Sequence, residues 1–358
     1  MKLSRRFEKS GIAMIIVMIV IFVLSILAAG FAYSMKVEVK LALNSNNDPE
    51  VEWLGRSGIE YAKYVLALQS RIPNQNTFEA LNQSWAGGTS TNSMAEETPL
   101  ESVELGGGKF TVKITDLERK FNINMADEPV IQQALLIMGV DAGSFPIIAS
   151  SIQDWVDQDD GERINGAESD FYMGLNPPYA AKNGLIDDMS ELLLIKGITP
   201  ELYWGSGATN AQLTRFQTRF ERPNAGGEPA SYPVGLVDIF TTLSSGRINI
   251  NTASLLNLQM IPEVDENVAS SILRMRAGPD GVEGNEDDVP FRNVGELVNV
   301  PGLPRQVVQQ LARYCDVRSH TFEVHVDVDV RGTRREYFAV VRRSNNAADF
   351  QTLKFFWK

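Results

Sequence analysis

The sequence has few of the residues on which metalloenzymes and disulfide-bonded proteins depend. Its 358 residues include one cysteine, Cys315, which excludes an intramolecular disulfide and a multi-cysteine zinc site. The two histidines, His320 and His325, lie in a segment of alternating polar and apolar residues, where we expect strand residues rather than catalytic groups or ligands. No Ser-His-Asp or Cys-His arrangement suited to hydrolysis is evident, so we do not expect an enzyme.

Positive charge is also scarce. Lysine and arginine number 33 against 45 aspartate and glutamate, a net charge of −12 that becomes −15 without the +3 of the first eleven residues. This charge opposes general binding to nucleic acid or anionic lipid. Residues 299–315 resemble a helix-hairpin-helix element, but Pro304 replaces the second turn glycine and has no N–H to offer a DNA phosphate. We therefore expect this element to pack against other helices.

The most prominent feature present is an uncharged run from Ile12 to Met35. As a helix it would be about 36 Å long, enough to cross a hydrocarbon core of about 30 Å. The run is longer than the apolar core of a secretory signal and continues into a charged helical pattern, so we expect an anchor that is kept. The basic leader before it places the amino end in the cytoplasm.

The leader ends in Gly11, directly before the apolar run. This arrangement resembles the type IV prepilin signal, which a prepilin peptidase cuts after the glycine, and it would make Ile12 the mature N-terminus. The alternative is an ordinary single-pass anchor. The corresponding division is a leader at 1–11 and a transmembrane and assembly helix at 12–35.

Three segments alternate in the manner of half-buried strands, namely 109–116, 321–330 and 335–343. About two hundred residues of mainly helical pattern separate the first from the other two. The sequence therefore predicts one sheet interrupted by a helical insert. The predicted domains are the outer helix with the first strands at 36–120, the inserted helical domain at 121–313, and the last strands of the sheet at 314–358.

The insert contains an internal repeat. Asn122-Ile123-Asn124 and Asn249-Ile250-Asn251 each precede a short polar pair and a helical run, and 191–198 is similar to 296–303. An acidic loop lies between the two landmarks in each copy. This order predicts a duplicated helical unit.

The first acidic loop, 154–172, sets seven carboxylates against Arg163. They belong to Asp154, Asp157, Asp159, Asp160, Glu162, Glu168 and Asp170. Carboxylates held together in an ordered loop repel one another unless a hard cation neutralises them, and calcium takes 6–8 oxygen ligands. We expect Asp157, Asp159 and Glu168 to be ligands. A solvated acidic loop is the alternative.

The second acidic loop, 277–291, has no basic residue and several glycines, which allow turns that aim oxygens at one point. It predicts a second calcium site, with a flexible acidic hairpin tip as the alternative. The candidate ligands are Asp280, Asn285, Asp287 and Asp288.

These motifs in this order resemble the type II secretion system protein K family of minor pseudopilins. The resemblance spans nearly the whole chain, through the leader ending at Gly11 and the segments 154–160, 166–172, 176–184, 191–198 and 250–254. It implies an α+β fold, with a pilin-like long N-terminal helix packed on a small antiparallel sheet. It also implies a large, mainly α-helical inserted domain of duplicated helix-hairpin-helix or SAM-like units, and bound calcium.

The resemblance further implies a tip subunit of the type II secretion pseudopilus, anchored once in the inner membrane with its C-terminal domain in the periplasm. The implied partners are the minor pseudopilins I, J and perhaps H, and the prepilin peptidase. Most pilins carry glutamate at the fifth residue after the cleavage point, whereas Ile16 stands here. A subunit with no neighbour above it has no need of that carboxylate. A minor pilin of a type IV pilus and a membrane-tethered hydrolase are the alternatives.

Overall fold

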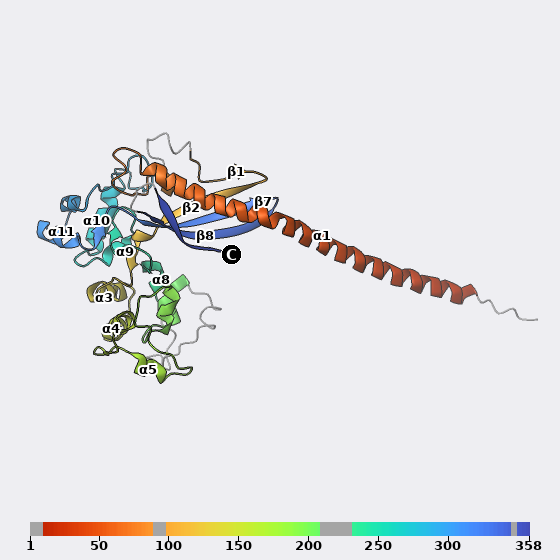
Figure 1. Cartoon of the computed structure of the whole chain (residues 1–358), viewed down its shortest axis with the longest axis horizontal. Coiled ribbons are helices and arrows are strands. Elements are labelled where there is room, and N and C mark those ends of the chain that lie inside the picture. The colour runs from red at the N-terminus through yellow and green to blue at the C-terminus, as the bar shows by residue number, and fades with distance from the viewer. Residues whose placement is uncertain (1–9, 89–97, 208–230, 345–348) are drawn as a thin grey trace, which may run out of the picture.

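The computed structural model describes residues 10–88, 98–207, 231–344 and 349–358, and for 10–12 and 43–46 it describes the backbone only. Its longest element is α1 (Ser10–Gln69), which extends far beyond the rest of the protein (Figure 1). Residues 13–42 of α1 are exposed, and this apolar part is long enough to cross a membrane. The uncharged run predicted as a spanning helix is thus a continuous helix.

The carboxyl-terminal part of α1 packs on a sheet. Val51 and Leu54 are buried there, and two glycines let the helix approach closely. A Cβ atom on Gly55 would lie 2.4 Å from the ring of Tyr337, and one on Gly58 would lie 2.4 Å from Val326. Side chains at these two positions would therefore push α1 away from the sheet.

The sheet has five antiparallel strands in the order β1 (Val103–Leu105), β2 (Gly108–Asp116), β7 (Thr321–Val330), β8 (Thr333–Arg343) and β9 (Phe350–Trp357). Apolar and polar residues alternate along the strands, so the apolar side chains lie on one face, which α1 covers. On that face Val112, Val326 and Tyr337 are neighbours, because Val112 pairs with Val326 and Val326 pairs with Tyr337. The sequence predicted β2, β7 and β8. It did not single out β9, which forms the sheet edge and alternates less regularly.

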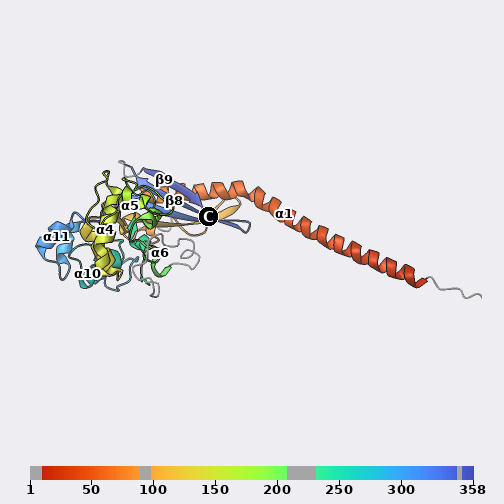
Figure 2. The ribbon, with the colours of Figure 1, turned by 90° about the horizontal axis from the view of Figure 1, so that it is seen from below.

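A helical region connects β2 to β7. It lies at the end of the sheet away from the exposed half of α1 in both views (Figures 1 and 2). It buries its own apolar core, separate from the core under α1. Its elements are β3 (Phe121–Asn122), α3 (Glu128–Ile137), α4 (Phe145–Val156), α5 (Ser169–Met173), α6 (Pro200–Trp204), α8 (Leu236–Ile239), β4 (Phe240–Thr241), β5 (Ile248–Asn249), α9 (Leu255–Gln259), α10 (Glu266–Arg276), α11 (Arg305–Leu311) and β6 (Cys315–Asp316).

The helical region extends slightly beyond the boundary predicted at residue 313. β6 pairs in parallel with β5 rather than with the five-stranded sheet, which resumes at Thr321. The other short strands, β3 and β4, pair in the same parallel manner. Each parallel pair thus joins the first residues of one half of the helical region to the last residues of that half.

The two Asn-Ile-Asn segments make the same hydrogen bonds. Asn124 exchanges two bonds with the backbone of Ile186, at 2.7 and 3.0 Å, and Asn251 exchanges two with the backbone of Phe291, at 2.8 and 2.9 Å. In each copy the first asparagine also accepts from the backbone N–H of the second. Each segment thus ties a short strand to the chain that follows an acidic loop, as a duplicated unit requires.

A buried carboxylate joins the helical region to the sheet. Asp116, the last residue of β2, accepts hydrogen bonds from the hydroxyls of Thr252 (2.5 Å) and Ser319 (2.6 Å) and from Asn249 Nδ2 (3.2 Å). Burial raises the pKa of Asp116, and burial together with Asp116 raises the pKa of neighbouring Glu118 well above its usual value. Two of these donors lie in the second half of the insert and one lies in the chain that returns to β7, so Asp116 links the insert to the sheet.

Candidate metal-binding loops

The first acidic loop begins where α4 ends, and its centre is Glu168. This side chain is 4% exposed, and both of its carboxylate oxygens are buried without a hydrogen-bond partner. Asp157 Oδ1 is also buried without a partner. Burial, followed by the nearby carboxylates of Asp154 and Asp157, raises the pKa of Glu168 to about 7. An uncompensated buried carboxylate is costly and calls for a cation.

The loop is held closed around Asp154, which has no exposed side-chain surface. Its oxygens accept from the backbone N–H groups of Arg163 (3.3 Å) and Ala167 (2.9 Å) and from the Arg163 guanidinium (2.8 Å), which also donates to Asp157. A Cβ atom on Gly166 would lie 1.8 Å from Asp154 Oδ2. Only glycine fits there without a rearrangement of the loop.

The structure distinguishes the three expected ligands of this loop. Asp157 and Glu168 both present buried oxygens without hydrogen-bond partners, although the other oxygen of Asp157 pairs with Arg163. Asp159 is exposed, and its Oδ1 accepts from the backbone N–H of Gly161 at 2.8 Å. The structural role of Asp154 was not predicted, although it shares the buried face of α4 with Ile152 and Trp155.

The second acidic loop joins three of its four candidate ligands, Asp280, Asn285 and Asp287, in one hydrogen-bonded network. Asn285 donates to Asp280 at 2.7 Å and accepts from the backbone N–H of Asp287 at 3.2 Å. Asp288 Oδ2 accepts from the N–H of Gly284 at 2.8 Å, whereas its Oδ1 is buried without a partner. Burial raises the pKa of Asp288. One carboxylate oxygen here is thus also left for a cation.

A buried arginine that the sequence analysis missed anchors this second loop. Arg276, directly before the loop, pairs with Glu283 and donates to the carbonyls of Ile250 (2.5 Å) and Ala253 (2.8 Å). It thereby links the loop to the second Asn-Ile-Asn segment. At Gly278, where φ is +67°, a Cβ atom would lie 2.1 Å from the carbonyl oxygen of Asp287, which accounts for the glycine.

The raised pKa of Glu168 predicts a pH dependence of stability in chelator. A carboxyl with an unfolded pKa of about 4.3 and a folded pKa of about 7 binds more protons when folded, so unfolding free energy should fall as pH rises from about 4 to 7. The effect is at most about 3 kcal/mol. Urea unfolding of the unmodified protein and of Glu168→Gln at pH 5 and pH 8 measures it. Other buried carboxylates titrate in both proteins, so the difference isolates Glu168. Parallel pH profiles would contradict the prediction.

Comparison with known proteins finds one family model and several relatives that resemble the chain. Residues 113–204 match the family described as type II secretion system (T2SS), protein K, and residues 244–316 match the helix-hairpin-helix motif. The chain is 29% identical to the putative type II secretion system protein K of Escherichia coli K12, over 55% of this chain and 60% of that protein. It is 23% identical to type II secretion system protein K of Aeromonas hydrophila, over 95% and 94%.

The fold also resembles a solved structure. A chain in the crystal structure of the GspK–GspI–GspJ complex from enterotoxigenic Escherichia coli matches with a TM-score of 0.61 and 18% identity, over 88% of this chain and 99% of that chain. The long helix on an antiparallel sheet and the helical insert are thus shared with a known fold. The sequence matches thus identify the chain as a relative of type II secretion system protein K, and the structural likeness adds that the fold is shared.

Proposed function

We propose that the protein is a minor pseudopilin at the tip of the type II secretion pseudopilus, where it initiates assembly and supports protein export across the outer membrane. One observation carries the proposal. The exposed half of α1 leaves the protein at one end, and the helical region lies at the other end of the sheet (Figure 1). In a filament built on such helices, this region occupies the space of a subunit further from the membrane.

The apolar half of α1 supports the same placement. Residues 13–42 are exposed, so in the membrane or in a filament they have only lipid or other helices to contact. Ile16 stands where most pilins have a glutamate for a neighbouring subunit. A subunit at the tip has no neighbour above it that needs such a carboxylate.

The related complex suggests the partners. It contains GspI and GspJ beside GspK, and we extend that association to this chain, with protein H as a further candidate. The anchor would lie in the inner membrane and the folded domain in the periplasm. A role in a type IV pilus is the competing assignment, and neighbouring pilus genes in place of secretion genes would favour it.

Calcium is the second part of the proposal. Glu168 and Asp157 would hold one ion, and Asp288 with Asp280, Asn285 and Asp287 would hold another, since both groups contain buried oxygens without partners. The hard oxygen donors suit calcium, which would neutralise the repelling carboxylates and stabilise each loop.

The first prediction from this proposal concerns processing. A prepilin peptidase should cut after Gly11, so N-terminal sequencing of the protein from the membrane should begin at Ile12. Gly11→Val should leave the leader attached, because the larger side chain blocks the cleavage site, whereas Gly30→Val should be processed normally. A mature protein that begins elsewhere would rule out this maturation route.

The second prediction concerns the tip. In overproduced pseudopili, antibody to the folded domain should label one end only, and label along the whole length would contradict a tip position. Ile16→Glu should lower export or leave it unchanged, because an unpaired carboxylate in the membrane costs about 2.5–3.5 kcal/mol. Ile16→Leu is the matched control. A clear rise in export with Ile16→Glu would count against the assignment.

The third prediction concerns calcium. Free calcium at a hundred times its dissociation constant should stabilise the fold by about 2.7 kcal/mol per site. Glu168→Gln should lose the gain from the first loop, yet at pH 8 in chelator it should be at least as stable as the unmodified protein. Asp288→Asn tests the second loop, and exposed Glu162→Gln is the control. Thermal unfolding checks all four proteins, and identical curves with calcium and chelator in the unmodified protein would refute both sites.

A further inference from the structure

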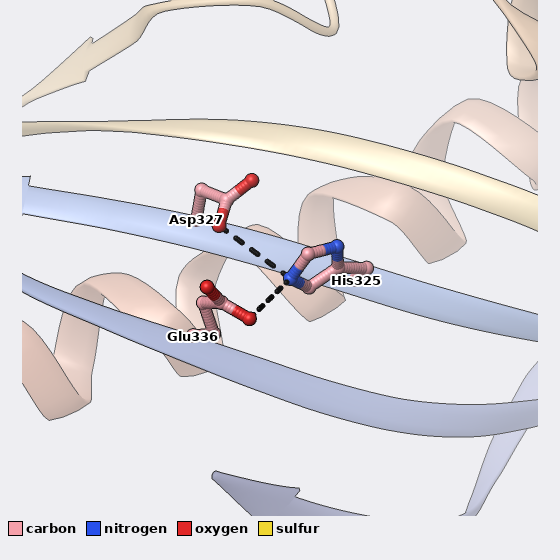
Figure 3. A group of neighbouring side chains, drawn as sticks. All are labelled: His325, Asp327 and Glu336. Atoms are coloured by element: carbon pink, nitrogen blue, oxygen red, sulfur yellow. Dashed lines mark ion pairs between the residues drawn. The ribbon is translucent and has the colours of Figure 1, made fainter. Parts of the chain in front are cut away.

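Three potential metal ligands gather on the sheet face that points away from α1 (Figure 3). His325 and Asp327 are two residues apart on β7, so both lie on this face, while the intervening Val326 is buried under α1. Glu336 on β8 is the register partner of Asp327. The β7–β8 hairpin therefore brings one imidazole and two carboxylates together.

The imidazole points its Nε2 atom between the two carboxylates. Nε2 lies 3.4 Å from Asp327 Oδ1 and 3.4 Å from Glu336 Oε2. It is buried, and it has no hydrogen-bond partner. The ring is fixed in this direction by Phe338, on which it stacks with a centroid distance of 4.4 Å and an angle of 6°. Nε2 is thus held in position by the stacked ring and makes no hydrogen bond.

The two carboxylates form no direct ion pair with the described lysines and arginines, although Lys109, Arg334 and Lys358 line the same surface pocket as these carboxylates. Within the part of the chain that the structure describes, neither Asp327 nor Glu336 pairs with lysine or arginine, and their ion pairs go to His325 alone. Asp329, two residues further along β7, differs because Arg334 pairs with it at 3.3 Å. Both carboxylates of the cluster also line an open surface pocket of about 500 Å³, so a cation from solvent can reach them.

The spacing fits a metal ion better than direct hydrogen bonds. Two ligand atoms about 2.0–2.1 Å from a tetrahedral ion are roughly 3.3–3.4 Å apart, which agrees with the 3.4 Å measured here. A hydrogen bond between nitrogen and a carboxylate is typically about 2.7–2.9 Å long. All three ligand atoms lie within 4.8 Å of one another, so one ion can reach them with small side-chain rotations.

We propose that His325, Asp327 and Glu336 form a binding site for a divalent transition metal, with Zn²⁺ as the best match. An imidazole nitrogen with two carboxylate oxygens suits zinc, whereas calcium prefers a shell made of oxygen alone. The remaining coordination position opens to the surface pocket and would hold water. The site is independent of the acidic loops and of the proposed place in the pseudopilus.

The test uses the full chain without an affinity tag, purified in detergent and freed of metal by chelation. Millimolar calcium is present throughout so that the acidic loops do not compete for zinc. Competition with a chromophoric chelator measures zinc stoichiometry and affinity. Electron paramagnetic resonance of added Cu²⁺ reports whether one imidazole nitrogen is coordinated. The variants are His325→Gln and Asp327→Asn, with His320→Gln and Asp329→Asn as matched controls.

We expect one equivalent of zinc and a copper spectrum with a single nitrogen. His325→Gln and Asp327→Asn should weaken zinc binding by more than the roughly 10–100-fold that removal of an outer-shell partner costs. His320→Gln and Asp329→Asn should bind like the unmodified protein. Absence of stoichiometric zinc, or equal binding by His325→Gln and His320→Gln, would overturn the proposal and leave the cluster as an ion-pair network.

Discussion

The buried carboxylate of Asp116 is at the centre of the polar contact between the sheet and the helical region. It ends β2, and its donors Thr252, Asn249 and Ser319 belong to the second repeat and to the chain that returns to β7. Loss of such a group would leave several donors unpaired in the interior, at about 1–3 kcal/mol each. Glu118 is buried beside it, and its raised pKa shows that the junction disfavours two negative charges. Polar contacts at the end of β2 thus join the sheet to the insert, together with hydrogen bonds from Arg342 on β8 and Lys354 on β9.

The two halves of the insert share the same asparagine hydrogen bonds but differ in how arginine pairs with the carboxylates of the acidic loop. Asn124 and Asn251 anchor the chain after each acidic loop through the same pair of backbone bonds. In the first loop an exposed arginine pairs with Asp154 and Asp157 but leaves Glu168 without a partner. In the second, buried Arg276 pairs with Glu283 and leaves one oxygen of Asp288. Both loops therefore keep a carboxylate oxygen that only a cation or a proton would neutralise.

The elongated shape of the protein reflects which apolar side chains are buried and which are exposed. The carboxyl-terminal part of α1 buries apolar side chains such as Val51 and Leu54 against the sheet. The side chains of residues 13–42 are exposed and can contact lipid or other helices. The helical region covers its own core and lies toward the end of the sheet away from the exposed part of α1 (Figure 2). The sheet face away from α1 carries many polar residues, and His325 lies there stacked on Phe338. The exposed apolar part of α1 and the helical region thus lie at opposite ends of the protein (Figure 1).

Local patterns in the sequence determined the long apolar helix, the strands β2, β7 and β8, the paired Asn-Ile-Asn segments and the acidic loops, because each depends on short-range periodicity or composition. Edge strand β9 escaped notice since its residues are half exposed and lack regular alternation. The acidic loops also showed which residue types could hold a cation. Only the tertiary structure decided that Glu168 is buried and Asp159 exposed, that Asp116 joins the two parts, and that Glu336 meets His325. Those facts depend on contacts between segments far apart in the chain and on strand register, which local sequence does not encode.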